Sequence, residues 1–224
     1  MQRELIITKD GSTTFYIPEL NENYHSTNGA ILEAQHVFLK HGMHYYLDRF
    51  PANEISILEI GFGTGLNAWL TWLEAEKMNV KVNYVGVEAF PIATHELTML
   101  NYAKILKDED ENAKFEYLHA VNWNENHQLD AIFSLLKMEQ FFENIDFKNQ
   151  FDIIYFDAFG FDVQPDLWST TILKKMYDSL KSNGHFTTYA CRTLIKKNLQ
   201  EVGFVTQKLP GAPGKREMLV GFKI

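Results

Sequence analysis

The chain has 224 residues, of which 46% are hydrophobic, and a net charge of −8. This hydrophobic content supports a folded core and excludes a wholly disordered chain. Because no run of about 18 apolar residues occurs, the sequence predicts no membrane span, and its first residues lack the apolar block of a signal peptide. Cys191 is the single cysteine, which excludes an internal disulfide and fits a cytoplasmic location. The length suits one domain, residues 1–224.

The charge is divided unevenly along the chain. Residues 165–224 hold ten basic and four acidic side chains, a net charge of +6, whereas the remainder carries −14. Such a division lets one basic face meet phosphate groups while the rest of the surface stays acidic. An ordinary solvated helix face gives the same count, so charge alone leaves nucleic-acid binding open.

Residues 1–40 are predicted to form an N-terminal appendage and a helix, and residues 41–224 the core. Two weakly alternating apolar segments flank an Asp10-Gly11 turn, a pattern typical of a small β-hairpin. Apolar residues then recur at helical spacing through residues 30–40. His36 and His41 lack partners at metal-ligand spacing, so no metal site is expected there.

The most informative stretch is 56–67, in which an apolar run gives way to alternating glycines. Residues 55–60 predict a short buried strand, and the residues after the glycines predict a helix. Gly61, Gly63 and Gly65 form a turn at which a ligand is able to approach the backbone. Strand, glycine turn and helix make the first unit of a nucleotide-binding α/β fold. The alternative, a tight turn without a ligand, needs fewer glycines.

The spacing of these glycines distinguishes the turn from those that bind dinucleotides and nucleoside triphosphates. Dinucleotide-binding folds use Gly-x-Gly-x-x-Gly, but Leu66 occupies the third glycine position. A Walker loop requires Gly-Lys-Ser/Thr, which is absent. Glu59 precedes Gly61 by two residues, and this arrangement resembles motif I of class I S-adenosylmethionine (SAM) methyltransferases. The stretch therefore predicts a SAM site.

The second predicted strand, residues 81–88, ends in an acid. Glu88 follows Gly65 by 23 residues, close to the spacing at which an acid binds ribose hydroxyls. Phe90 is then available to pack on a purine ring. A lone acid at a strand end is common, so Glu88 gains its meaning from the glycines before it.

Residues 92–147 contain the least regular patterns. We expect a helix over 92–107, a solvated acidic loop over 108–112, a third strand over 115–121 and an amphipathic helix and connection over 128–147. The acids of the loop are consecutive, which gives no reason to expect a metal. Asn122 follows directly after the predicted third strand.

The fourth predicted strand, residues 151–157, ends in Asp157. First and fourth strands are neighbours in such a sheet, so Asp157 is expected to face the ligand from the side opposite Glu88. Phe159 and Phe161 follow it and suit a flat substrate. An acid that caps the next helix is the alternative.

The last third of the chain predicts two more helices and three strands. The helices are 165–180 and 193–201, the fifth strand is 185–189, and strands 204–209 and 217–222 form a closing hairpin. The whole pattern predicts a Rossmann-like class I SAM methyltransferase. Its sheet is expected to be mostly parallel and seven-stranded, with a C-terminal antiparallel hairpin and a small N-terminal β appendage.

Several stretches, in order over almost the whole chain, resemble the MnmC/MnmD methyltransferase family, and their shared order makes the resemblance specific. The matching pieces are Tyr24-x-Ser26-x-x-Gly29-Ala30-x-x-Glu33-x-x-His36-Val37-Phe38-Leu39, Leu58-Glu59-Ile60-Gly61-Phe62-Gly63-Thr64-Gly65-Leu66-Asn67, Phe156-Asp157-Ala158-Phe159, Pro165-x-Leu167-Trp168, Thr188-Tyr189, Gly203-Phe204 and Gly214-Lys215-Arg216-Glu217-Met218-Leu219.

The resemblance implies methyl transfer from SAM to the amine of 5-aminomethyl-(2-thio)uridine at the tRNA wobble position. It implies the stand-alone type of the family, without the fused flavin domain and therefore without flavin. The amine is expected to displace the methyl group in line, with Asp157 orienting it and receiving or relaying its proton. The expected SAM contacts are Tyr24, Glu59, Gly61, Gly63, Gly65, Asn67, Glu88, Phe90, Asn122 and Asp157, and the expected substrate contacts are Phe159, Phe161, Arg192, Lys215 and Arg216.

The chain departs from the family pattern on the expected substrate side. Gly160-Phe161 stands where the family usually has Ala-Pro, and the residues from Arg192 onward also differ. These departures concern the acceptor and leave the predicted SAM site unchanged. Three rival interpretations stay open: a methyltransferase for a small amine or a protein, a SAM- and RNA-binding module without turnover, and a nicotinamide dehydrogenase. The dehydrogenase is disfavoured by Leu66. The sequence does not specify the tRNA species, the need for 2-thiolation, the source of the amine or the oligomeric state.

Overall fold

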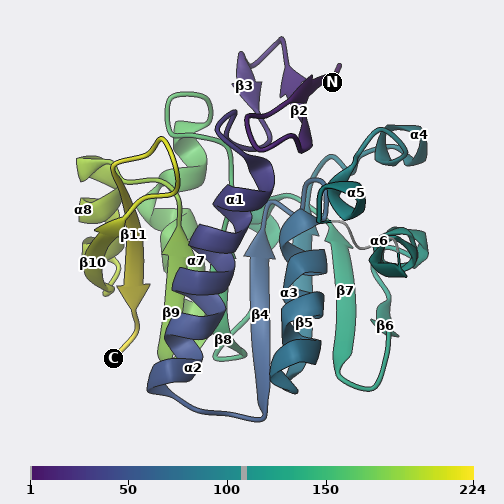
Figure 1. The fold of residues 1–224 in the computed structure, drawn as a ribbon. Coiled ribbons are helices and arrows are strands. Elements are labelled where there is room, and N and C mark those ends of the chain that lie inside the picture. The colour runs from purple at the N-terminus through teal and green to yellow at the C-terminus, as the bar shows by residue number, and fades with distance from the viewer. Residues whose placement is uncertain (1, 107–109) are drawn as a thin grey trace.

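The computed structural model describes residues 2–106 and 110–224. Within them, one large sheet carries helices on both faces, and a small three-stranded sheet lies above its carboxyl edge (Figure 1). The large sheet has the strand order β10-β11-β9-β8-β4-β5-β7-β6. Its strands are β4 (Glu54–Ile60), β5 (Lys81–Glu88), β6 (Asn126–Gln128), β7 (Phe133–Glu139), β8 (Phe151–Phe156), β9 (Leu180–Thr188), β10 (Val205–Pro210) and β11 (Glu217–Phe222).

The pairing of these strands confirms the predicted Rossmann-like fold. Strand β4 is parallel to both β5 and β8, so the first and fourth main strands are neighbours as expected. Strand β11 is inserted antiparallel between β9 and β10 and forms the closing hairpin. The short edge strand β6 pairs antiparallel with β7 and brings the described sheet to eight strands, one more than predicted.

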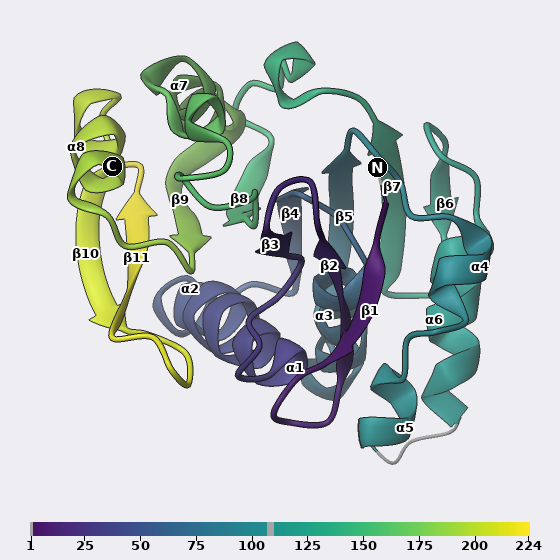
Figure 2. The ribbon, with the colours of Figure 1, turned by 90° about the horizontal axis from the view of Figure 1, so that it is seen from above.

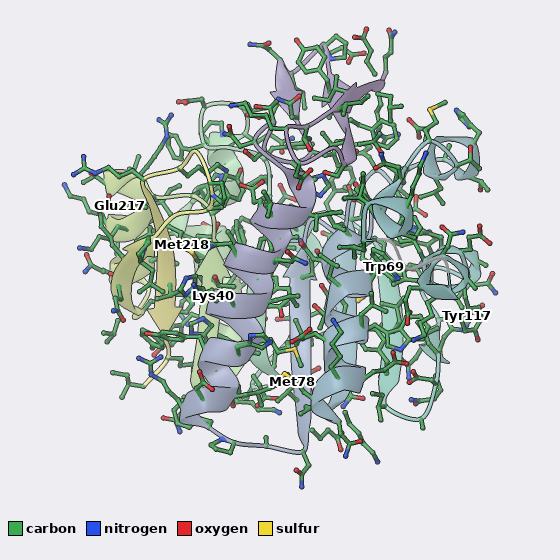
Figure 3. The ribbon with its side chains drawn as sticks, in the orientation of Figure 1. Lys40, Trp69, Met78, Tyr117, Glu217 and Met218 are labelled. Carbon is green, nitrogen blue, oxygen red and sulfur yellow. The ribbon has the colours of Figure 1, made fainter. Side chains whose placement is uncertain are left out.

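Helices cover the two faces of the sheet unequally (Figure 2). One face carries the N-terminal helical segment, α3 and α6, and the other carries α7. Trp69 on α3 is fully buried and packs edge-on against Phe115 of α6, whereas Tyr117 of α6 points outward (Figure 3). The helices are α1 (Ala30–Ala34), the π-helix η1 (Gln35–His44), α2 (Tyr45–Arg49), α3 (Leu66–Met78), α4 (Thr94–Leu97), α5 (Tyr102–Leu106), α6 (Asp110–Ala120), the 3₁₀ turns η2 (Phe142–Asn144) and η3 (Pro165–Trp168), α7 (Thr170–Ser179) and α8 (Thr193–Glu201).

The N-terminal appendage is a three-stranded antiparallel sheet of β1 (Glu4–Ile7), β2 (Thr13–Ile17) and β3 (Glu22–Asn23). The predicted hairpin is therefore confirmed and gains a third strand. The helix expected over 30–40 continues to Arg49, with a π-helical middle section. No helix among residues 2–106 and 110–224 has the length and apolar character needed to cross a membrane.

Two predictions between β5 and β8 are wrong. Residues 115–121, expected as the third strand, belong to α6 except for the last, because Phe115 and Leu118 bury one face at helical spacing. Residues 128–147, expected as a helix, contain the true third strand, β7. This strand pairs along its whole length with β5, from Val82 opposite Phe133 to Glu88 opposite Glu139.

The expected helix over 92–107 is also wrong in its continuity. Two short helices, α4 and α5, occupy this stretch with a break at residues 98–101, and residue 107 lies outside the described residues. Of the acidic loop expected over 108–112, residues 108 and 109 lie outside the described residues. The remaining three begin α6, so that part of the loop prediction is wrong.

Candidate functional site

The glycine turn between β4 and α3 lies at the carboxyl edge of the sheet, in conformations that favour glycine. The φ angles of Gly61, Gly63 and Gly65 are 89°, 49° and 71°. A Cβ atom on Gly61 would lie 2.6 Å from the backbone oxygen of Asp157, and one on Gly63 would lie 3.1 Å from the ring of Tyr24. The glycines therefore allow close packing on both sides, as well as room for a ligand.

A cavity of about 440 Å³ opens beside this turn, where β4, β5 and β8 end. Its wall includes the residues after β7 and the Tyr24-His25 segment of the N-terminal appendage. Cavities of this size hold small-molecule ligands. Of the predicted site residues, those that line it are Tyr24, Gly61, Gly63, Asn67, Glu88, Phe90, Asp157 and Phe159.

Glu88 stands at the tip of β5 and faces the glycine turn. The backbone N–H of Gly63 donates to its Oε2 at 3.0 Å, and the N–H of Phe90 donates to its Oε1 at 2.9 Å. These bonds fix the carboxylate at the cavity wall, in the position that binds ribose hydroxyls in related folds. Phe90 is 47% exposed and packs edge-on against Phe141, which also lines the cavity.

Asn67, in the first turn of α3, joins two acidic groups. Its Nδ2 donates to Glu59 Oε1 and to Asp157 Oδ2, each at 2.9 Å. Glu59 is fully buried behind the cavity, and burial raises the pKa of its carboxyl well above the usual range. Burial and the charge of Glu33 raise the pKa of Asp157 to about 7. Glu59 thus acts on the cavity through Asn67, while Asp157 lines it directly.

Arg3 connects the N-terminal appendage to the far wall of the cavity, a role that sequence analysis missed. Its Nε donates to the hydroxyl of Tyr24 at 2.8 Å, and its Nη2 to the backbone oxygen of Phe90 at 2.6 Å. Its Nη1 pairs with Glu96 Oε2 at 2.9 Å, and only 8% of the arginine side chain is exposed. No motif surrounds Arg3, so the sequence carries no signal for this clamp.

A smaller cavity of about 140 Å³ continues from Asp157 on the side away from the glycine turn. Tyr24, Asp157 and Phe159 line both cavities. Acidic groups from two other elements, Glu22 and Glu33, also face the smaller one. Its size and its carboxylate acceptors suit a small amino group next to Asp157.

A third cavity, of about 410 Å³, adjoins the small one and shares Glu22, Tyr189 and Lys215 with it. Arg192 forms an ion pair with Asp162 at its rim, and the guanidinium lies 5.7 Å from the ring centre of Phe161. Four of the five residues predicted to contact the substrate therefore line this third cavity, and only Phe159 does not. The predicted ones that line this cavity are Phe161, Arg192, Lys215 and Arg216.

Three predicted SAM contacts lie elsewhere. Glu59 is behind the wall, and Gly65 shapes the turn without lining the cavity. Asn122 was assigned on the premise of a strand over 115–121, which is wrong; it follows α6 and donates to Glu125. The wall after the true third strand is formed instead by Phe141, Phe142 and Glu143. Among the residues that the structure describes, no cluster of three metal-ligating side chains occurs.

A family profile relates this chain to methyltransferases, and curated relatives align with it over most of its length. The profile of a family described as S-adenosyl-L-methionine-dependent methyltransferase matches residues 100–224. Curated relatives include the tRNA 5-methylaminomethyl-2-thiouridine biosynthesis bifunctional protein MnmC of Hydrogenovibrio crunogenus, 28% identical over 88% of this chain and 31% of the relative. The MnmC of Burkholderia thailandensis is 30% identical over 97% of this chain and 34% of the relative. The chain thus spans about a third of the length of these relatives.

Solved structures with the same fold include MnmC2 from Aquifex aeolicus, with a TM-score of 0.78 and 24% identity over 98% of this chain and 70% of that one. Spermidine synthase from Thermotoga maritima has a TM-score of 0.55 and 16% identity, over the whole of this chain and 72% of that one. At these identities, both likenesses show the fold.

The cavity fits the cofactor of the matching family. A glycine turn with positive φ angles and a fixed carboxylate at the tip of β5 surround it. Two buried polar atoms, Glu59 Oε2 and Asn67 Oδ1, adjoin it and have no hydrogen-bond partner among residues 2–106 and 110–224. Gly61, Gly63, Asn67 and Glu88 would hold SAM. The chain belongs to the S-adenosyl-L-methionine-dependent methyltransferase family, as a class I enzyme of the MnmC methyltransferase-domain type.

Proposed function

We propose that this protein transfers a methyl group from SAM to the amine of 5-aminomethyl-(2-thio)uridine at the wobble position of tRNA, in the cytoplasm. The observation that carries the proposal is the arrangement of three neighbouring cavities. The SAM cavity shares Asp157 with the small acidic cavity, which in turn shares Tyr189 and Lys215 with a cavity lined by arginines and aromatic rings. The MnmC relatives, which align over 88% and 97% of this chain, are named for the biosynthesis of 5-methylaminomethyl-2-thiouridine in tRNA, and this supports the proposed substrate.

The third cavity has the chemistry needed for a nucleotide that leaves its base stack. Phe161 and Tyr189 offer aromatic surfaces to a base, and Arg192 and Arg216 offer guanidinium groups to phosphate. The aminomethyl group of such a base would reach the small cavity, where Asp157 is available. A small free amine needs no such basic and aromatic wall, so this cavity favours tRNA over the rival amine substrates.

SAM supplies an activated methyl group, which moves to the amine nitrogen as the sulfur–carbon bond breaks and a neutral thioether leaves. The amine must be unprotonated, because an ammonium has no lone pair. Asp157 in its ionised form accepts a hydrogen bond from the amine and takes up the proton released after transfer. Asn67 holds Asp157 in place through the 2.9 Å bond to Oδ2. Most of the acceleration is expected from positioning.

The test uses labelled SAM and tRNA from cells that accumulate the aminomethyl nucleoside. We expect label in tRNA, in a nucleoside heavier by one methyl group on mass spectrometry, and no label in a mixture of small amines and proteins. Asp157→Asn, with its SAM binding measured by titration, should transfer much less label and serves as the negative control. Transfer into the mixture but not into tRNA would overturn the proposed substrate.

A further inference from the structure

Lys215 was expected to contact tRNA phosphate, but its ammonium group faces the small acidic cavity. The residue lies on the loop between β10 and β11, and its Nζ pairs with Glu33 Oε1 at 2.5 Å. The same Nζ lies 3.9 Å from the centre of the Tyr189 ring, close enough for a cation–π contact. Glu33 is anchored in turn, since its Oε2 accepts from the backbone N–H of Ser26 at 2.7 Å.

The position of Lys215 is fixed by the fold of its loop. The backbone N–H of Lys215 donates to Ala212, a buried residue, at 2.8 Å. Gly214, with a φ of 84°, packs so closely on Asn28 that no Cβ fits. The loop is thereby held against the segment that leads into α1, and the lysine reaches inward from it. In this position the ammonium is held between the Glu33 carboxylate and the Tyr189 ring.

We propose that Lys215 is an electrostatic residue of the acceptor site, where its positive charge favours the unprotonated form of the acceptor amine and the ionised form of Asp157. This inference rests on the proposed function. The acceptor ammonium and the Asp157 carboxyl must each lose a proton before methyl transfer. A fixed positive charge nearby lowers the pKa of both groups and so favours both deprotonations. The charge of Lys215 does lower the pKa of Asp157, against the larger effects of burial and of Glu33.

Other charged groups also act on this cavity. On the side of the third cavity, Arg216 and Arg192 add positive charge, while Asp162 and Glu217 pair with Arg192 and Lys208 respectively. The titratable groups that face the small cavity together with Lys215 are Glu22, Tyr24, His25, Glu33, Asp157 and Tyr189.

The two members of the ion pair should have opposite effects on pH dependence. Lys215→Met removes the positive charge, so the rising limb of kcat against pH should move up by about one unit, a roughly tenfold loss of rate near pH 7 that is recovered near pH 9. Glu33→Gln removes the negative charge that raises the pKa of Asp157, so the limb should move down. Lys215→Arg should restore most of the wild-type profile.

Arg216→Met is the matched control, on the same loop but lining only the third cavity. We expect it to raise the KM for tRNA and to shift the pH profile much less than Lys215→Met does, because Arg216 does not line the small cavity. A Lys215→Met variant that raises KM with an unshifted profile would assign Lys215 to phosphate binding and overturn the inference. If the Lys215–Glu33 pair were purely structural, the pH profiles of Lys215→Met and Glu33→Gln would not shift in opposite directions, and this result would also overturn the inference.

A second measurement needs no tRNA and covers variants that are inactive. Titration of the Asp157 carboxyl by ¹³C NMR should show its pKa raised in Lys215→Met and lowered in Glu33→Gln. If these shifts occur but the wild type methylates no tRNA, the proposed function fails. If the wild type methylates tRNA and neither the titration nor the profile moves, the inference about Lys215 fails.

Discussion

The Nδ2 of Asn67 lies 2.9 Å from Oε1 of Glu59 and 2.9 Å from Oδ2 of Asp157, so one amide bridges two acids on neighbouring strands. Both hydrogens of the amide are used by these bonds. The bridge lowers the pKa of each carboxyl, against burial, which raises it. Asn67 therefore connects the motif I acid to the residue proposed to meet the acceptor amine.

We predict that Asn67→Leu destabilises the protein by about 1–3 kcal/mol, because two buried acids lose their donor. The loss should be larger at pH 8 than at pH 6, since the unbridged carboxyls resist ionisation more strongly. Urea unfolding at the two pH values measures this difference. Thr71→Val, one turn further along α3, removes only a bond to the Asn67 carbonyl and should show no such dependence on pH. Equal losses at both pH values would contradict the electrostatic role of the bridge.

Asp157→Asn should lower turnover by about 10²–10⁴-fold, the usual contribution of a general base. The same variant should be more stable than the wild type, although it is less active. Folding raises the pKa of Asp157 from 3.8 to about 7, so its protonated form stabilises the fold below pH 4, and this contribution is lost as the pH rises through 7. Asparagine is neutral at every pH, so the variant should gain stability relative to wild type between pH 5 and 8. Unfolding curves and SAM titrations provide the measurements; full turnover would exclude the proposed role.

Arg3→Met should weaken SAM binding about tenfold, or 1.4 kcal/mol, without a comparable change in kcat at saturating SAM. The arginine fixes the Tyr24 hydroxyl and the backbone of Phe90, and both residues line the SAM cavity. Isothermal titration with SAM tests this expectation. Arg49→Met is the matched control, because Arg49 also stacks on an aromatic ring, Tyr45, but lies on α2 at the other end of the sheet. Equal weakening in both variants would indicate a general loss of stability.

Elements with a strong local sequence pattern were predicted correctly, whereas those with a weak pattern were not. The strand, glycine turn and helix around Gly61 were predicted correctly, because an apolar run and three glycines leave few other conformations. The third strand was misplaced, because residues 115–121 and β7 are both short apolar segments, and only the pairing of β7 with β5 decides between them. Asn122 consequently follows a helix, and it does not line the SAM cavity.

Contacts between distant segments had no sequence signal. Arg3 meets Phe90 across 87 positions, and Lys215 meets Glu33 across 182. The basic segment predicted a tRNA contact for Lys215, but it gave no sign that the ammonium would pair with Glu33. The acceptor site is therefore assembled from segments whose individual patterns are those of ordinary loops and helices.

Gly61→Ala should destabilise the protein by roughly 1–3 kcal/mol or more, because φ at this position is 89° and the new Cβ would lie 2.6 Å from the backbone oxygen of Asp157. Relief of this contact would push β4 and β8 apart at their carboxyl ends, so SAM binding should weaken as well. Gly160→Ala is the matched control: its φ is not positive, and its Cβ would meet nothing closer than 3.4 Å. We expect the control to change stability by no more than about 0.5 kcal/mol. Thermal unfolding of both variants, with and without SAM, measures their stability and their SAM binding. A Gly61→Ala variant as stable as Gly160→Ala would contradict the prediction, because it would show that the backbone at Asp157 is free to move.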